Sequence, residues 1–510
     1  MKNATVRLLA LASAAVLALS VSACAAPTGN DDSGEASVEQ PLRVAYPQDV
    51  SSLDPIHGNA GTDHAILWTM YDTLVNWDPE TLEPLPGLAE SWDLSDPNVI
   101  ALTLREGVTF QDGTEFDADA VKFNLDRAAA EGSNITTDVA SIASVDVVDP
   151  THVNINLKAP NSALLLILTD RAGMMVSPTA AEKYDGDLSL NPVGAGGWSF
   201  VEWRRGASVT VEKYEDYWDK DAVRAPQIVF SVITDPTTRV SALTSGQQDF
   251  VVDVPPSSAQ ALESSASDKL LQSSRVLIAQ IYLNDAKPEI ADVRVRQALA
   301  LAINRDEILE TGYFGYGSVA NEWMPADHWA NAGEKYDYDP DEARKLLKEA
   351  GATNLTFDLA LTQDPNWIRV GEILKAQWAE VGVTINLVPV ENTQGSTDHF
   401  ADGKTVAWMA NWTGRPDPSQ TFLSLFGKDG YFNAGHVDFD GLQGAVDAAN
   451  AATDQSDRAA SFKDAADVVY DQVPAIPLVF ADLLVGTSDK VSGYVPNLLG
   501  KPKFIGITVG

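Results

Sequence analysis

The stretch "IRVGEILKAQWAEVGVTINLVPV", residues 368–390, predicts a helix, a glycine and then a strand. Just upstream, "DPDEARKLLKEAG" (339–351) carries a complete helix signature. Asp339 suits the N-cap, Pro340 suits the first turn, and Gly351 follows the last turn. Because helix and strand alternate here, we predict an α/β body built from layers.

Other stretches extend this pattern towards the N-terminus. "VNINLK" (153–158) alternates between apolar and polar residues, which predicts a half-buried strand, and "PLRVAYP" (41–47) predicts another. Residues 101–116 predict two strands joined by an Asp-Gly turn, and residues 117–132 predict an amphipathic helix. The spacing of apolar residues over 65–77 is helical.

The composition limits the possible partners. The 72 acidic residues outnumber the 35 basic residues and give a formal net charge of −37. Such a surface repels nucleic acid and anionic lipid headgroups, so we expect no nucleic-acid partner. A hydrophobic content of 45% is that of a globular protein, and the length predicts two to four domains.

The N-terminus is typical of a secretory signal, with a short basic start and an apolar segment over 8–19. The single cysteine of the chain, Cys24, ends the stretch "VSAC", which resembles the lipobox of bacterial lipoproteins. That likeness implies a lipoprotein signal peptide over 1–23, and a lipidated Cys24 that begins a flexible tether over 24–40. The protein would then be anchored by lipid alone at the outer face of the cell membrane. A plain signal peptide with a chance cysteine is the alternative.

The sequence contains no motif of a hydrolase, a phosphate-binding loop or a zinc site. Its six histidines are scattered. His57 and His64 are seven positions apart, but Pro55, Gly58 and Gly61 predict a loop there rather than a helix with a metal-binding face. We therefore expect no catalytic residue, no metal and no cofactor.

The strongest indication of binding lies in "WMANWTGRPDPSQTFLSLF" (408–426). Trp408 and Trp412 are four positions apart, and Arg415 and Asp417 follow among glycine and proline. Tryptophan rings offer broad, stiff apolar contacts, and an arginine fork fits a carboxylate. In the structural alternative, both tryptophans lie in the core and Arg415 pairs with Asp417.

Several blocks match one family in their order along the chain. They are "SSLDP" (51–55), "YDTLV" (71–75), "PGLAESW" (86–92), "TLREGVTFQDGTEFDADAVKFN" (103–124), "NPVGAGGW" (191–198), "RVSALTSGQQDF" (239–250), "DVRVRQALALAINRDEI" (292–308), "YDPDEARKLLKEAG" (338–351) and "VPAIPL" (473–478). From Pro41 to the C-terminus, the chain resembles the extracellular solute-binding proteins of family 5. This is the dipeptide, oligopeptide and nickel group of ABC importers.

The resemblance implies a periplasmic-binding-protein-like type II clamshell with an extra domain. Domain I would comprise residues 41–74, 194–286 and 481–510. Domain II would comprise 75–193, and domain III would comprise 287–480. The ligand would be enclosed between domains I and III, because binding residues on two rigid bodies meet when a hinge closes.

The resemblance also implies a monomeric receptor that catches a small peptide or peptide-like solute and delivers it to a membrane permease driven by ATPase subunits. Similar dipeptide binders place an acidic residue, which meets the amino terminus of the peptide, about where Arg415 stands here. We therefore expect Arg415 to pair with a carboxylate of the solute and Trp412 to pack beside it. Asp417, two positions after Arg415, is expected to belong to the same ligand-binding site. His57 and Asn59 would line the domain I side of the pocket.

Other ligands remain open within the same fold: an oligosaccharide, an opine, a glutathione-like solute or a metal chelate. A nickel role is disfavoured because residues 408–419 contain no histidine. The alternatives from other classes are a secreted, lipid-anchored hydrolase, which would need a nucleophile with a base, and an adhesin or chaperone-like protein, which would need repeats or an exposed apolar stripe.

Overall fold

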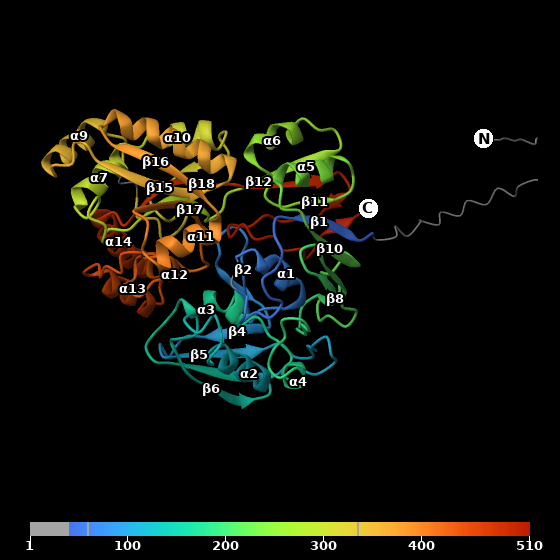
Figure 1. The fold of residues 1–510 in the computed structure, drawn as a ribbon. Helices are drawn as coiled ribbons and strands as arrows, with labels where there is room; N and C mark the ends of the chain where they lie inside the picture. Colours follow the sequence, from blue (N-terminus) through green and yellow to red (C-terminus); the bar gives the residue numbers. More distant parts are fainter. Residues whose placement is uncertain (1–39, 59–60, 334–335) are drawn as a thin grey trace, which may run out of the picture. The chain divides into compact units, whose positions relative to one another are not determined.

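The computed structural model describes residues 40–58, 61–333 and 336–510 (Figure 1). Glu39–Gly510 form one compact unit of the chain. Cys24, Asn59, the expected signal peptide and nearly all of the expected tether lie outside the described residues. Every helix in the described ranges is too short or too polar to cross a lipid bilayer.

Strands from three separate parts of the chain form a seven-stranded sheet. Its order is β12 (Asp268–Ser273), β19 (Leu483–Ser488), β11 (Phe250–Val251), β1 (Leu42–Tyr46), β10 (Gln227–Val232), β9 (Ser208–Lys213) and β8 (Trp198–Arg204). β1 runs parallel to β10 and β11, and the remaining neighbours are antiparallel. The strand predicted within 41–47 is confirmed as β1.

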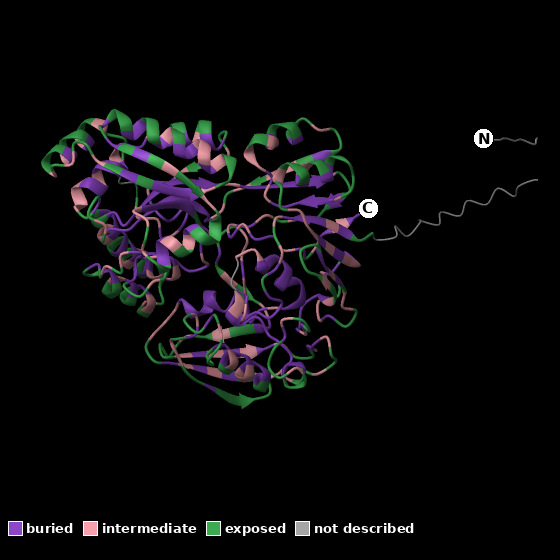
Figure 2. Ribbon diagram, viewed as in Figure 1, coloured by how far each residue is buried: buried purple, intermediate pink, exposed green. Residues whose placement is uncertain are grey.

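A six-stranded sheet forms the core of the second half of the chain. Its order is β14 (Gly317–Val319), β18 (Ala475–Ala481), β13 (Ile278–Leu283), β17 (Ala407–Trp412), β15 (Thr356–Thr362) and β16 (Thr384–Val390). β15 is parallel to β16 and β17, and α10 (Pro365–Glu380) packs on β15 and β16. The helix–glycine–strand prediction for 368–390 is therefore confirmed. Every residue of β13 and β18 is buried, and Figure 2 shows these strands between more exposed helices.

A four-stranded antiparallel sheet lies within residues 89–157. Its order is β4 (Ala89–Asp93), β5 (Val99–Leu104), β7 (His152–Leu157) and β6 (Ile142–Asp149). β7 alternates between buried and less buried residues, as predicted. The helix predicted within 117–132 is α2 (Ala118–Ala128), and the Asp117 side chain caps it by accepting from Ala120 N–H.

The remaining elements connect or cover these sheets. The helices are α1 (Asp63–Met70), α3 (Leu164–Ile167), α4 (Pro178–Lys183), α5 (Pro236–Thr244), α6 (Pro256–Glu263), α7 (Val293–Leu301), α8 (Arg305–Glu307), α9 (Pro340–Glu349), α11 (Asn392–Ser396), α12 (Pro418–Phe426), α13 (Leu442–Ala451) and α14 (Gln455–Gln472). Other helical turns are η1 (Arg171–Gly173), η2 (Ile308–Gly312) and η3 (Thr397–Ala401). Small two-stranded sheets pair β2 (Val75–Trp77) with β3 (Pro84–Pro86), and β20 (Val491–Ser492) with β21 (Thr508–Val509).

Two expectations hold only in part. Helical spacing continues to residue 77, but α1 ends at Met70 and β2 follows. Tertiary contacts override the spacing, because the Met70 carbonyl accepts hydrogen bonds from Gly196 N–H and from the Gln111 side chain. In 101–116 the turn is present, with Gly113 at φ +82°, but the second strand is reduced to a single bridge between Thr109 and Glu115.

Each large sheet has a hydrophobic core of its own, which is the property expected of a domain. The division into three domains remains our proposal, with one adjustment. β13 falls inside the range first given to domain I, yet it pairs with β17 and β18 in the six-stranded sheet. The boundary is therefore better placed before Ile278, in the crossover that follows β12.

Candidate functional site

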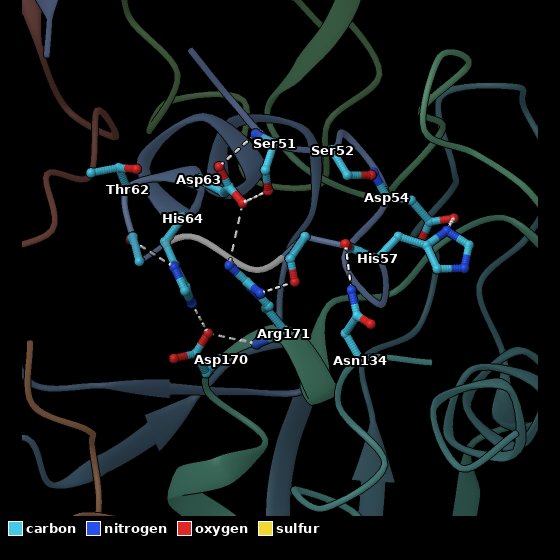
Figure 3. Close-up of polar contacts among 12 residues, drawn as sticks. Ser51, Ser52, Asp54, His57, Thr62, Asp63, His64, Asn134, Asp170 and Arg171 are labelled. Atoms are coloured by element: carbon cyan, nitrogen blue, oxygen red, sulfur yellow. Dashed lines mark hydrogen bonds and ion pairs between the residues drawn. The ribbon is translucent and has the colours of Figure 1, made fainter. Parts of the chain in front are cut away.

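The loop between β1 and α1 is fixed by hydrogen bonds that converge on Asp63 (Figure 3). Ser51 donates to Asp63 through its backbone N–H over 2.9 Å and through its hydroxyl over 2.5 Å. Arg171 lies 3.4 Å from Asp63 Oδ2 and also donates to the carbonyl of Gly58. Arg171 thus ties this loop to η1.

His57, in the same loop, lies beside two carboxylates, Asp54 from this loop and Asp187 from the segment after α4. Its Nδ1 is 3.4 Å from Asp54 Oδ2 and 3.9 Å from Asp187 Oδ1, and the three side chains are close enough to share a cation. However, Arg127 donates to Asp54 Oδ1 over 2.9 Å and also to Oδ2. Because a guanidinium already balances the buried carboxylate, this group is a poor metal site.

A buried group of charges surrounds Asp170. His64 Nε2 contacts Asp170 Oδ1, and Lys501 Nζ lies 3.6 Å from Asp170 Oδ2. Burial alone would raise the pKa of Asp170, but His64, Lys501 and Arg171 together hold it well below its usual range. Burial lowers the pKa of His64 to about 4 and, with the nearby guanidinium of Arg415, that of Lys501 to about 8. Asp170 is therefore ionised at neutral pH, and the cations Lys501 and Arg171 lie near it.

Arg415 projects from the loop between β17 and α12. Its guanidinium lies over the ring of Trp412, 4.6 Å from the ring centroid. Nη1 donates to the carbonyl of Gly414 over 2.8 Å and contacts the Thr413 hydroxyl at 3.3 Å. Burial lowers the pKa of Arg415, while the carboxylates of Asp170 and Asp138 oppose this shift. Arg415 forms no ion pair within 4.0 Å in the described ranges, so its outer N–H groups can still donate to a carboxylate.

The two tryptophans differ in their relation to Arg415. Trp412 is 2% exposed, packs edge to face on Phe432 at 5.0 Å and carries Arg415 on its ring. Trp408 is 1% exposed, and a Cβ added at Gly395 would lie 2.4 Å from its ring. Trp412 therefore positions the guanidinium, and the structure places Trp408 in the core of the six-stranded sheet.

Asp417 has intramolecular partners for both carboxylate oxygens. Oδ1 accepts from the backbone N–H of Ser419 over 2.9 Å, which caps α12, and from its hydroxyl over 2.7 Å. Oδ2 pairs with Arg458 over 2.7 Å, and Asp417 is fully buried. The alternative pairing of Arg415 with Asp417 is therefore wrong, because Arg458 takes that place. These contacts give Asp417 a structural role beside the site.

The structure thus brings Arg415 and Trp412 together and surrounds them with residues that sequence reasoning did not identify. These residues are Asp138, Asp170, Arg171 and Lys501. They come from the loop after α2, from η1 and from the C-terminal segment. No local spacing connects such distant positions, so only the tertiary fold reveals the cluster.

The loop that carries Arg415 belongs to the part of the chain with the six-stranded sheet, and it lies near Asp138 and Asp170 from the part with the four-stranded sheet. These two parts have separate hydrophobic cores, and this arrangement suits a receptor that encloses a small solute. Residues 83–434 match the middle region of the bacterial extracellular solute-binding proteins, family 5, and the chain belongs to that family. It is accordingly a substrate-binding protein of an ABC importer rather than an enzyme, and it acts outside the cytoplasm together with an ABC permease.

Known relatives cover nearly the whole chain. The glutathione-binding protein GsiB of Salmonella paratyphi A is 30% identical over 468 residues, which span 88% of this chain and 91% of that protein. NikZ from Campylobacter jejuni, solved in complex with Ni(L-His), has a TM-score of 0.80 at 25% identity and covers 89% of this chain and 95% of its own. DppA from Helicobacter pylori, solved with the peptide STSA, has a TM-score of 0.81 at 24% identity. The match covers 92% of this chain and 98% of the DppA chain. The predicted family and the type II periplasmic-binding-protein fold are confirmed.

Proposed function

We propose that this protein captures a small peptide or peptide-like solute between the segment 413–420, which includes the first turn of α12, and the segments around Asp63 and Asp170. Arg415 binds a carboxylate of the solute, and the solute packs beside Trp412. The single observation that carries this proposal is a guanidinium held on a tryptophan ring without an ion-pair partner in the described ranges. An arginine fork binds carboxylates through two parallel hydrogen bonds.

The ligands named for the relatives have a chemistry in common. Glutathione, a peptide and L-histidine each contain a carboxylate and an amino group, although they differ in size and in metal content. A cationic group that donates hydrogen bonds to a carboxylate could bind each of these three ligands. Glutathione is the first candidate for this chain, since its binding protein is similar over 88% of the sequence.

A thermal-shift screen of the purified protein tests this function. We expect glutathione or a short peptide to raise the unfolding temperature, because a ligand at about 100 times its Kd stabilises the folded state by about 2.7 kcal/mol. Ni(L-His) and a neutral oligosaccharide serve as comparisons. Stabilisation by the oligosaccharide alone would contradict the proposed carboxylate contact.

We also propose that Cys24 anchors the protein to the outer face of the membrane through lipid. Cys24→Ala should move the protein from the membrane fraction to the soluble fraction and abolish labelling by an alkyne fatty acid, because stable anchoring depends on acyl chains. Ser13→Ala, in the apolar segment over 8–19, should leave both readouts unchanged. Membrane retention of the Cys24→Ala protein would count against a lipid anchor.

A further inference from the structure

Asp138 lies in a loop that backbone contacts hold against the Asp54–Gly58 region. The loop follows α2, and Asn134 ties it down by donating from its backbone to Ile56 O over 2.8 Å. The Asn134 side chain also donates to His57 O over 2.7 Å (Figure 3). Within the loop, Asp138 N–H donates to Ile135 O over 3.0 Å. The loop that contains Asp138 is thus held in place by the Asp54–Gly58 region, which includes His57.

The side chain of Asp138 meets α12, the helix that begins just after Arg415. It lies close to the side chain of Gln420, and the charges of Asp170, Arg415 and Arg171 act on it. In the described part of the chain no cation lies within 4.0 Å of its carboxylate. Burial, aided by the like charge of Asp170, raises the pKa of Asp138 to about 6, while Arg415, Arg171 and Gln420 oppose the shift. A half-buried carboxylate without a counter-ion favours the arrival of a cation.

Gln420 supplies a second acceptor at the same place. Its backbone N–H donates to Asp417 O over 3.2 Å, which fixes the first turn of α12. Its Oε1 is buried and accepts no hydrogen bond from any described residue. A buried amide oxygen without a donor is costly, so a donor from a bound solute would stabilise it.

An ammonium group fits these two acceptors. It carries a positive charge and three N–H donors, so it can neutralise a carboxylate and donate to an amide oxygen at once. Neither a hydroxyl nor a second carboxylate offers both properties. Arg415, five positions before Gln420, supplies the complementary charge.

We propose that Asp138 and Gln420 bind the amino group of the solute whose carboxylate is bound by Arg415. The protein therefore selects solutes that carry both charges, such as unblocked peptides. This inference rests on the proposed function and adds a residue from the four-stranded-sheet body, proposed domain II, to a site first expected between domains I and III.

The experiment compares glutathione with its N-acetyl derivative by calorimetric titration of the full-length protein. The wild type should bind N-acetyl-glutathione at least tenfold more weakly than glutathione. Asp138→Asn, which removes the charge and nearly preserves the shape of the side chain, should bind glutathione at least tenfold more weakly and should no longer distinguish the two compounds. Gln420→Leu should weaken glutathione binding in the same direction. Glu131→Gln, an exposed change in the same loop, should behave as the wild type.

The pH provides an independent readout. Below about pH 6 Asp138 becomes protonated while the ammonium stays charged, so wild-type affinity should fall up to about tenfold between pH 7 and pH 5. Asp170 stays ionised and Arg415 stays charged across this range. The affinity of the Asp138→Asn variant should therefore change less with pH than that of the wild type, by the same factor of up to about ten.

The outcomes separate this inference from the proposed function. If Asp138→Asn keeps full affinity and discrimination while Arg415→Ala loses affinity, the amino-group assignment is wrong and the carboxylate contact stands. If Arg415→Ala also keeps full affinity, the proposed function fails with it. If neither compound binds the wild type, both assignments are contradicted.

Discussion

Arg415→Ala is expected to weaken the binding of a peptide-like solute at least tenfold. A hydrogen bond to a charged group contributes about 1.5–3 kcal/mol, and each 1.4 kcal/mol corresponds to about a tenfold change in Kd. The guanidinium is already placed on Trp412 and makes only two hydrogen bonds within its own loop in the described chain. Little ordering is then needed when the carboxylate arrives.

Calorimetric titration of the wild type and the variant checks this result. Arg205→Ala is the matched control, because Arg205 also lies over a tryptophan, 4.4 Å from the Trp203 ring, but at an exposed position. It should bind the solute with wild-type affinity. Arg415→Lys should lie between the wild type and Arg415→Ala, since lysine keeps the charge and loses the fork. Equal affinities of the wild type and Arg415→Ala would remove Arg415 from the site.

Asp417→Ala is expected to lower the free energy of unfolding by about 3–5 kcal/mol, as is usual when one member of a buried ion pair is removed. Arg458 would lose its carboxylate while remaining buried among aromatic rings, 5.1 Å from the centroid of Trp329 and 5.6 Å from that of Phe462. The N-cap of α12 would be lost as well.

Urea unfolding measures this change. Asp454→Ala is a suitable control, because Asp454 caps α14 from an exposed position and its loss should remove only about 1 kcal/mol. A loss of less than about 1 kcal/mol for Asp417→Ala would show that the Asp417–Arg458 pair contributes little.

The sequence predicted those elements whose determinants are local. α9 begins at Asp339 and Pro340 because the capping side chain, the proline and the apolar stripe lie within a few positions of one another. α1 was predicted too long, because the contacts that end it at Met70 come from Gln111 and Gly196. Distant partners of this kind leave no periodicity in the sequence.

The same limit applies to the site. The loop with Trp412 and Arg415 was visible because its residue types are unusual together, whereas Asp138, Asp170 and Lys501 carry no local signal. For Asp417 a signal was present: Asp417-Pro418 repeats the Asp339-Pro340 pattern, which is typical of a helix start. That pattern could have indicated the capping role of Asp417 from the sequence.

A crystal structure of the protein with bound glutathione would test the central claim most directly. Our account predicts that a glutathione carboxylate lies within hydrogen-bonding distance of the Arg415 guanidinium, and that the amino nitrogen lies within reach of Asp138 and Gln420. A ligand bound elsewhere, or bound here with a neutral group against Arg415, would contradict it.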